Sequence, residues 1–374
     1  MKILIIVAWM PYDKKPFHAV WIIDNLKALD SAGIDYDLLH IVIDDMDIHQ
    51  NKSLEKIYDK KLEKNIYRIT FSFSESIKEK IDRLNSFFNS KEFTRIVEGK
   101  DIIHSHNINP IAFSLVNNTN KQVVLTSHYT GLKSDMRFWR FKKYYKETIK
   151  KAILTTCVSE PYQKLMNSYN FDKRISVVHN AIDILKFKKI IKKEKRKYKL
   201  ISIGTFSKRK GTDILIKAIS LIVKKNNDID FHITIIGGTD SNMLEYKNLV
   251  KKENLEDFVE LKHYQTREWI ENKLCEYDLF IVSSLVETFS VVTVEAMAAG
   301  LPILTTKCNG PESLINEKIG LVVKKNSIKS LYTGLMKIIP NIDMFDSDYI
   351  HNYAYNNYSI EKIGLEWKKI YEEI

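Results

Sequence analysis

Short apolar segments rich in β-branched residues recur along this chain, and longer amphipathic segments separate them. They fall at residues 2–8, 36–42, 101–104, 122–126, 153–158 and 174–178, and again at 199–204, 231–238, 258–264, 278–284 and 302–306. Such alternation is typical of βαβ units, because the strands of a parallel sheet are buried on both faces and read as continuous apolar runs. The pattern predicts an α/β fold built on parallel sheets.

The alternation stops once, at "ILKFKKIIKKEKRKYK", a basic stretch without turn residues that begins at residue 184. A chain of 374 residues is also too long for one ordinary hydrophobic core. We therefore expect two consecutive α/β domains of similar size, at residues 1–184 and 185–355, joined within this basic stretch.

The composition is that of a globular protein, with 44% hydrophobic and 28% charged residues. The first segment, "MKILIIVAWMPY", has one Lys, an early Pro and no small-residue cleavage site, so it predicts a strand and not a signal peptide. No apolar run approaches the ~20 residues that span a bilayer. The sequence predicts a cytoplasmic protein.

Its scattered cysteines, Cys157, Cys275 and Cys308, have no metal-ligand spacing and predict unreactive thiols without zinc.

The formal net charge of +11 has two interpretations. A positive protein attracts anionic partners, such as nucleic acid, an anionic membrane or a phosphorylated substrate. Alternatively, the excess Lys reflects a compositional bias spread over solvated faces. Charge alone does not separate these interpretations.

One candidate site lies in "SIGTFSKRKGTDILIKAI", residues 202–219, which runs from a strand through Gly204 and a cationic loop into a helix. Thr212 or Asp213 is the expected N-cap of that helix. Cations beside a helix N-terminus favour an anion, although the spacing matches neither a P-loop nor a dinucleotide fingerprint. The alternative is a solvated turn that happens to be basic.

A second candidate site lies in "SSLVETFSVVTVEAMAAGLPILTT", residues 283–306, between two predicted strands. Glu287 falls in the loop after the first strand, and Glu295 falls one to two turns into the helix that follows. Carboxylates at the carboxyl end of a parallel sheet can accept hydrogen bonds from vicinal hydroxyls. The alternatives are a first-turn partner of the helix dipole and an ordinary exposed helix residue.

These segments resemble the signatures of family-4 retaining glycosyltransferases (glycosyl transferases group 1). "ETFSVVTVEAMAAGLP" is similar to the family's E-G-F-G-x-x-x-x-E-A-M-A-x-G-x-P, and "GTFSKRKGTDILIKA" is similar to its G-R-L-x-x-x-K-G loop. The remaining similar segments, in chain order, are "DIIHSH" (101–106), "VVLTSHYTG" (123–131), "VVHNAID" (177–183) and "CNGPESLI" (308–315). Ordered agreement over most of the chain is much more specific than any single motif.

The resemblance implies a GT-B fold, in which two Rossmann-like domains face each other across a cleft and the last helix, residues 356–374 here, crosses back to the first domain. Residues 359–374, "SIEKIGLEWKKIYEEI", are amphipathic enough for that helix. The first domain would bind the acceptor and the second the nucleotide-sugar donor. Catalytic roles would fall to His128, Glu287 and Lys210. Donor contacts would come from Gly204, Thr205, Arg209, Lys210, Thr288, Phe289, Ser290, Val291 and Glu295.

Within that set, Glu295 would hold the ribose, Glu287 the donor sugar, and Lys210 with Arg209 the diphosphate. Negative charge grows on the departing diphosphate, so fixed cations can stabilise the leaving group without a metal. We expect no metal and no cofactor, and a UDP-sugar as the co-substrate. The triplets at 35–37, 228–230 and 346–348 imitate a metal-binding D-x-D, but none follows a strand in a suitable loop.

The sequence also departs from the family pattern. The loop "MPYDKKPFHAVW" (10–21) has no Gly where the family often has two. Thr205 replaces the Arg that follows the loop Gly, and His263 and Thr288 stand where Gly is usual. These changes affect the geometry of donor binding more than the class of reaction. His104 and His106 of "HSH" are interpreted as structural.

A basic and aromatic segment, "DMRFWRFKKYYKETIKKAI" (135–153), stands apart from the motifs. Helices of this composition lie on anionic membrane surfaces. The same residues would equally suit a helix with one buried aromatic stripe.

Together these features predict a retaining, metal-independent hexosyltransferase that uses a nucleotide-sugar. Its acceptor would be a glycan or a lipid-linked glycan in bacterial surface polysaccharide synthesis, at the inner face of the membrane, with no nucleic acid involved. The alternatives are a nucleotide-sugar epimerase or a phosphorylase on the same fold, or a basic nucleic-acid-binding protein. The last lacks any recognisable reading motif.

Overall fold

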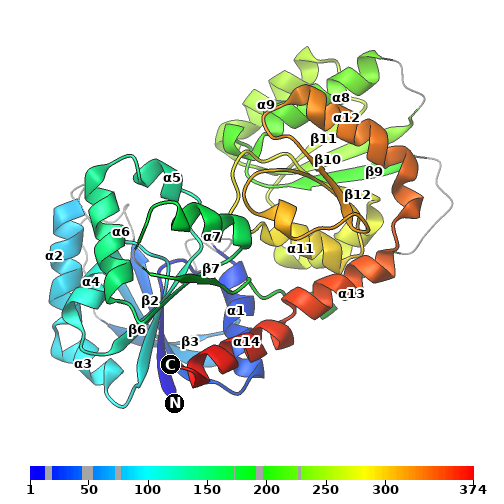
Figure 1. Ribbon diagram of the computed structural model, residues 1–374. Helices are drawn as coiled ribbons and strands as arrows, with labels where there is room; N and C mark the ends of the chain where they lie inside the picture. The colour runs from blue at the N-terminus through cyan, green and yellow to red at the C-terminus, as the bar shows by residue number, and fades with distance from the viewer. Residues whose placement is uncertain (13–18, 44–53, 72–76, 172, 191–196, 226–228) are drawn as a thin grey trace. The chain divides into compact units, whose positions relative to one another are not determined.

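The computed structural model describes residues 1–12, 19–43, 54–71, 77–171, 173–190, 197–225 and 229–374. The chain divides into two compact units. The first unit consists of residues 1–181 together with 360–374, and the second consists of residues 182–359. Both units appear in Figure 1. Parts of the loop at 10–21 and of the basic stretch after residue 184 lie outside the described residues.

Within the described residues, the first unit contains an eight-stranded sheet in the order β3-β4-β2-β1-β5-β6-β7-β8. Neighbouring strands are parallel, except that β3 and β4 form an antiparallel pair at one edge. The strands are β1 (Lys2–Val7), β2 (Asp35–Ile43), β3 (Glu55–Asp59), β4 (Lys64–Phe71), β5 (Ile102–His106), β6 (Gln122–Ser127), β7 (Leu154–Cys157) and β8 (Ile175–Val177).

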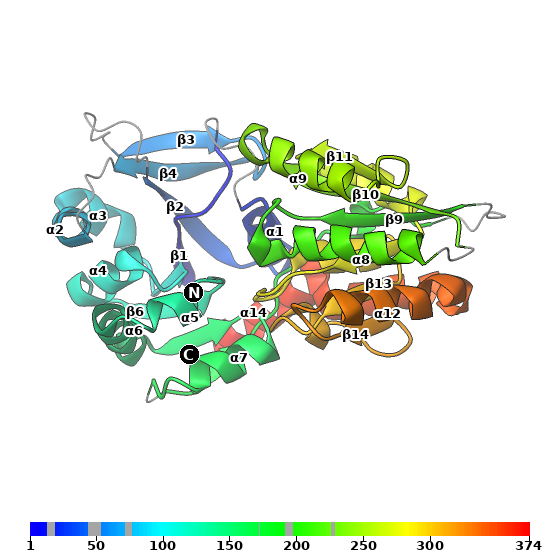
Figure 2. The ribbon, with the colours of Figure 1, turned by 90° about the horizontal axis from the view of Figure 1, so that it is seen from above.

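Helices cover both faces of this sheet (Figures 1 and 2). On one face, α14 packs against α1, and their apolar residues share a buried core with β1, β2 and β5. On the other face α2 packs against α4, and α4 against α6. The helices are α1 (Trp21–Ser31), α2 (Ile77–Phe88), α3 (Lys91–Val97), α4 (Pro110–Asn118), α5 (Leu132–Asp135), α6 (Trp139–Lys151), α7 (Glu160–Asn167) and α14 (Ile360–Glu372).

The second unit contains, in its described part, a six-stranded sheet in the order β11-β10-β9-β12-β13-β14, with every neighbouring pair parallel. This is the strand order of a Rossmann fold, 3-2-1-4-5-6. Its strands are β9 (Tyr198–Ile203), β10 (Phe231–Gly238), β11 (Val259–His263), β12 (Leu279–Val282), β13 (Ile303–Thr306) and β14 (Gly320–Val323).

Helices also cover the two faces of the second sheet (Figure 1). α8 contacts α9 and α12 on one face, and α11 packs against β12 and β13 on the other, with α13 behind it. The helices are α8 (Thr212–Lys224), α9 (Asp240–Lys252), α10 (Arg267–Lys273), α11 (Val291–Ala298), α12 (Ile328–Ile338) and α13 (Ser347–Tyr358).

The predicted α/β fold with two parallel sheets is confirmed, and each apolar segment named from the sequence is a strand. The N-terminal segment is β1. Among the described residues, no helix combines the length and the apolar character needed to cross a bilayer. The three cysteines are free, and burial raises the pKa of each thiol, to about 12 for Cys157, which fits unreactive thiols.

Candidate functional site

The strand order of the second unit reverses between β9 and β12. At such a switch point the loops leaving the carboxyl ends of the two strands diverge and open a crevice, where ligands of parallel α/β folds bind. The loop after β9 runs from Gly204 to Gly211, and the loop after β12 runs from Ser283 to Ser290. These are the two motif segments that the sequence singled out.

The loop after β9 is shaped by its own side chains. The Ser207 hydroxyl accepts a hydrogen bond from the Lys210 N–H at 3.3 Å and caps a single 3-10 turn, Lys208–Lys210. Gly211 then takes a left-handed conformation (φ +65°) and serves as the N-cap of α8. The expectation that Thr212 or Asp213 is the N-cap was wrong, because the chain needs a left-handed residue to pass from the 3-10 turn into the helix.

Two hydrogen bonds to backbone carbonyls join the two loops. Ser283 Oγ donates to the Lys210 carbonyl at 2.9 Å, and the Leu285 N–H donates to the Arg209 carbonyl at 2.8 Å. A Cβ on Gly211 would lie 2.1 Å from the Ser283 carbonyl oxygen, so only glycine permits this approach. The contact holds Lys210 directly opposite the loop after β12.

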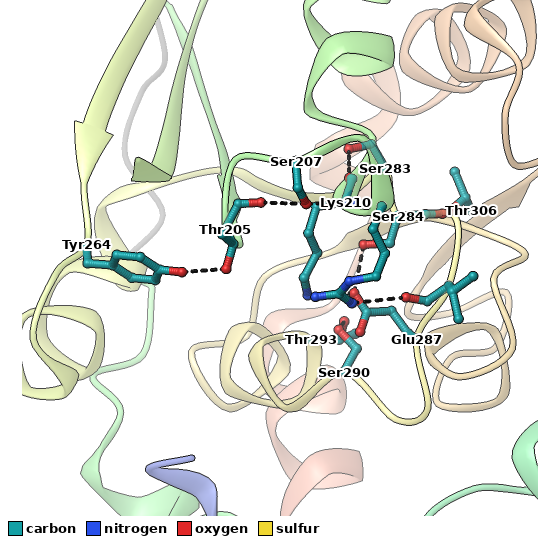
Figure 3. A network of polar contacts seen from close by, with 12 residues as sticks. Thr205, Ser207, Lys210, Tyr264, Ser283, Ser284, Glu287, Ser290, Thr293 and Thr306 are labelled. Atoms are coloured by element: carbon teal, nitrogen blue, oxygen red, sulfur yellow. Dashed lines mark hydrogen bonds and ion pairs between the residues drawn. The ribbon is translucent and has the colours of Figure 1, made fainter. Parts of the chain in front are cut away.

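Lys210 and Glu287 form the centre of the site (Figure 3). Lys210 Nζ donates to Glu287 Oε1 at 2.6 Å, and Ser284 Oγ donates to the same oxygen at 2.7 Å. The two side chains are only 19% and 7% exposed. Burial alone would raise the pKa of the Glu287 carboxyl, but Lys210, Ser284 and Arg209 outweigh it and hold the pKa below its usual value. Glu287 is therefore a carboxylate at neutral pH.

A third loop, after β13, supports Glu287 from behind. The Glu287 N–H donates to the Cys308 carbonyl at 2.9 Å, and a Cβ on Gly310 would lie 2.8 Å from the Phe289 nitrogen. Glu312 holds this loop together, because its two carboxylate oxygens accept the N–H groups of residues 308, 309 and 310 at 2.8 to 3.1 Å. The sequence pointed to the segment "CNGPESLI", but nothing in it predicted that Glu312 would bind the backbone of this loop.

The residues at the start of α11 lie where the sequence placed them, between Glu287 and the helix. Thr288 and Phe289 are buried, and the Phe289 ring meets Tyr358 edge-on at 5.8 Å. Ser290 has a positive φ of 79°, and its hydroxyl lies 2.8 Å from that of Thr293. Val291 is the first residue of α11. The N-terminus of α11 therefore follows closely after the buried carboxylate of Glu287 in the sequence.

Glu295 is buried, and not exposed as one alternative supposed. Its Oε1 lies 3.2 Å from Nη1 of Arg267, which opens α10. The same guanidinium contacts Glu271 through Nε at 3.4 Å and lies 5.9 Å from the Phe187 ring. Sequence reasoning missed Arg267, because no local pattern connects a residue at a helix start with a carboxylate 28 positions later.

The remaining predicted donor residues lie in the loop after β9. Gly204 lies next to the Lys210 side chain, since its missing Cβ would be 3.2 Å from Lys210 Cδ. The Thr205 hydroxyl contacts the hydroxyl of Tyr264, which follows β11 (Figure 3). Arg209 is exposed, and its Nη1 reaches the Val286 carbonyl at 3.4 Å.

Two of the acidic triplets have structural tasks. In the triplet at 35–37, which opens β2, Asp37 contacts Lys100 at 2.6 Å. In the triplet at 346–348, Asp346 is the N-cap of α13. The third triplet begins at residue 228, which lies outside the described residues.

His128 belongs to the first unit, directly after β6. Its Nε2 lies 3.0 Å from Nδ1 of His106, the last residue of β5, and its backbone N–H donates to Asn107 Oδ1 at 3.2 Å. The Trp21 ring lies 4.2 Å from the His128 ring. Burial lowers the pKa of both histidines, to about 3 for His106, so both are neutral at pH 7.

His104 lies deeper in the same row of rings. Its Nδ1 is 2.5 Å from the Tyr371 hydroxyl of α14, and its Nε2 is 2.7 Å from the Thr126 hydroxyl. Its ring stacks on that of His106 at 4.4 Å. His104 therefore links α14 to the sheet through its hydrogen bond with Tyr371. His106, in contrast, contacts the His128 ring directly.

Comparison with known proteins identifies the family to which this fold and these sites belong. Residues 19–185 match the model of Glycosyltransferase Family 4, and residues 183–356 match that of Glycosyl transferases group 1. The chain belongs to this family of glycosyltransferases, and its fold is GT-B.

Individual relatives agree with this assignment. An uncharacterized glycosyltransferase of Methanocaldococcus jannaschii is 29% identical over 74% of this chain and 76% of its own length. The phosphatidylinositol N-acetylglucosaminyltransferase GPI3 subunit of Saccharomyces cerevisiae is 27% identical over 54% of this chain and 46% of the subunit. Among solved structures, HepE of Anabaena in complex with UDP has a TM-score of 0.74 at 15% identity, over 100% of both chains. HepE has also been solved with UDP-glucose.

Proposed function

We propose that this protein transfers a sugar, with retention of anomeric configuration, from a UDP-sugar bound in the 182–359 unit to an acceptor bound in the first unit. The observation that carries the proposal is the buried Lys210–Glu287 pair at the β9/β12 switch point, inside motifs of a glycosyltransferase family. A fixed carboxylate and fixed cations at this position suit a donor that combines a sugar with a diphosphate.

The proposed chemistry is stabilisation of a departing diphosphate. Arg209 provides positive charge beside the loops at the start of α8 and α11, with a smaller share from the ion-paired Lys210, and negative charge on the diphosphate increases as the glycosidic bond breaks. These groups need no metal to act. Glu287 would bind the hydroxyls of the transferred sugar, and His128 would contact that sugar as a neutral imidazole.

Glu295 is proposed to hold the ribose hydroxyls. Its pairing with Arg267 supports this role in one respect, because an ion-paired carboxylate stays ionised in a buried site and so remains a hydrogen-bond acceptor. Arg267 would then fix the position of the carboxylate.

UDP is the nucleotide with the most support. HepE, which shares the fold, has been solved with UDP and with UDP-glucose.

The acceptor is proposed to be a lipid-linked glycan at an anionic membrane, in the synthesis of a bacterial surface polysaccharide. α6 supports membrane contact, because Phe138 and Trp139 at its start are 60% and 71% exposed beside several exposed cations. Exposed aromatic rings next to basic residues are typical of helices that rest on anionic lipid.

A donor panel tests the proposal. A ligand that binds only the folded protein raises its melting temperature, so UDP-glucose should raise it more than GDP-mannose or ADP-glucose does. Glu287→Gln should lose most of the shift, while Lys208→Met, an exposed neighbour on the same 3-10 turn, should keep it. NMR of the product should show a retained linkage.

Each outcome against the proposal points to a different error. No shift with any of the three donors would refute the donor site. An inverted product would refute retention, and conversion of UDP-glucose into another UDP-sugar without an acceptor would indicate an epimerase.

A further inference from the structure

We propose that a hollow lined in part by α2, α4 and α6 in the first unit binds the apolar chain of an anionic lipid acceptor. The proposal deepens the proposed function, on which it rests, by naming the chemical class that this unit recognises. It commits to an acyl or isoprenoid chain attached to a negatively charged headgroup.

The hollow lies at the carboxyl ends of β1, β5 and β6, where the order of the first sheet reverses between β1 and β5. It has a volume of about 330 Å³, within the range of small-molecule sites. Its lining is mainly aromatic and aliphatic, and includes Trp9, Ile81, Phe113, Tyr129, Phe141 and Tyr144. At about 30 Å³ for each water-sized group, it has room for about ten such groups.

Three polar atoms of the lining are already bound within the protein. Asn107 Oδ1 accepts the His128 N–H, and Asn109 Oδ1 accepts the Ala112 N–H at 3.1 Å as the cap of α4. Thr148 Oγ1 donates to the Tyr144 carbonyl at 2.6 Å.

Among the described lining residues, the single carboxyl group is similarly engaged. The side chain of Asp135 hydrogen-bonds to that of Tyr129, which also lines the hollow. A sugar ring would need several hydrogen-bond partners in place of its water. Most of the surface of the hollow is apolar, which suits a hydrocarbon chain.

The surroundings of the hollow indicate the charge of the headgroup. The face of α6 that carries Phe141, Tyr144 and Tyr145 forms one wall, and Lys80 of α2 also reaches the lining. Cations predominate at the exposed positions of the same helix and of the turn before it, beside the exposed Phe138 and Trp139: Arg137, Arg140, Lys142, Lys143, Lys150 and Lys151. The one acid of α6, Glu147, is 3.8 Å from Lys143. A lipid with its chain in the hollow would therefore have its anionic headgroup among cations.

A chain-length series tests this inference on the full protein. Binding of n-alkyl phosphates from four to sixteen carbons is measured by calorimetry, below their micelle concentrations. Each buried methylene should tighten Kd about fourfold. The gain should stop near ten carbons, when the hollow is full. A Kd independent of chain length, or competition by methyl glucoside as strong as by decyl phosphate, would overturn the proposal.

Substitutions locate the binding to this hollow. Ile81→Trp should fill it and weaken decyl phosphate at least tenfold, and Phe141→Ala should remove part of one wall and weaken it severalfold. Ser86→Trp, on the exposed side of α2, is the matched control and should bind normally. If both wall variants fold and bind like the unmodified protein, the chain is bound elsewhere and the proposal fails.

The melting shift with UDP-glucose separates this inference from the proposed function. That shift should be the same in all three variants, because the donor is assigned to the other unit. Loss of alkyl phosphate binding with an intact donor shift would support the hollow. Chain-length-dependent binding without any donor shift would leave the hollow standing and refute the proposed function.

Discussion

Replacing Lys210 by Met should leave a buried carboxylate without its cation. Glu287 is 7% exposed, and Lys210 Nζ lies 2.6 Å from its Oε1. At an effective dielectric constant of 20, two unit charges at this distance attract by about 6 kcal/mol before desolvation is subtracted. Removing one partner of a buried pair typically costs about 3–5 kcal/mol, because the remaining charge has no counter-ion. We expect Lys210→Met to lower the free energy of unfolding by about 3 kcal/mol at pH 7.

The same variant should reverse one contribution to the pH dependence of stability. In the unmodified protein the folded pKa of Glu287 is lowered, so its stabilisation is present above the unfolded value, about 4.3, and is lost as the pH falls through the folded pKa. Without Lys210, burial dominates and raises the folded pKa above 4.3. The variant should then gain stability as the pH falls from 8 to 5, by at most about 1.4 kcal/mol per pH unit.

Urea unfolding of four proteins measures both effects. They are the unmodified chain, Lys210→Met, Glu287→Gln and the double variant. Unfolding is monitored by the fluorescence of Trp269, the single Trp of the 182–359 unit. All four proteins carry Phe in place of the other Trp residues. The double variant should be more stable than the sum of the single losses predicts, by about 2 kcal/mol. Strictly additive losses would refute the reasoning. So would a Lys210→Met variant that loses stability as the pH is lowered, as the unmodified chain does.

Four further outcomes are expected. Activity should persist in EDTA, whereas loss with EDTA and recovery with Mn²⁺ would remove leaving-group stabilisation from the loop cations. Glu295→Gln should raise the donor KM with little effect on kcat in steady-state assays, because the ribose does not change during reaction. Gly211→Ala should lower the melting temperature more than Gly33→Ala, since both have φ near +65° but only the former would place a Cβ against a carbonyl oxygen. Sedimentation with anionic vesicles should weaken when four α6-region cations become Ser, each being worth about 1 kcal/mol near such a surface: Arg137, Arg140, Lys142 and Lys143.

The strands of the parallel sheets were predictable because burial on both faces leaves an unbroken apolar run in the sequence. Three strands lack that signal. β3 (Glu55–Asp59) and β4 (Lys64–Phe71) form the edge pair, and β3 is mostly exposed and rich in charge. β14 is also an edge strand, and its four residues are only partly covered. An edge strand needs less apolar surface, so its sequence resembles that of a loop.

The position of the candidate site was predictable for a related reason, and its internal contacts were not. Motifs between a strand and a helix fall at the carboxyl end of a parallel sheet, so the loops after β9 and β12 had to come close together. The partners within the site are set by packing between distant segments. Lys210 and Glu287 are 77 residues apart, and Glu312 binds the backbone of a loop in place of a ligand. Neither relation leaves a periodic or compositional trace.

The Lys210–Glu287 contact also changes how anion binding at this site should be understood. A lysine that donates at 2.6 Å to a buried carboxylate forms a pair that is neutral overall, so Lys210 alone brings little net positive charge to a diphosphate. Arg209 lies on the same 3-10 turn, is exposed, and has a planar guanidinium that can bind two phosphate oxygens together. Since Thr205 stands where the family signature has an arginine, Arg209 is the cation of this loop that we expect to contribute most to donor affinity. Lys210 would then act chiefly by holding Glu287 ionised and in place.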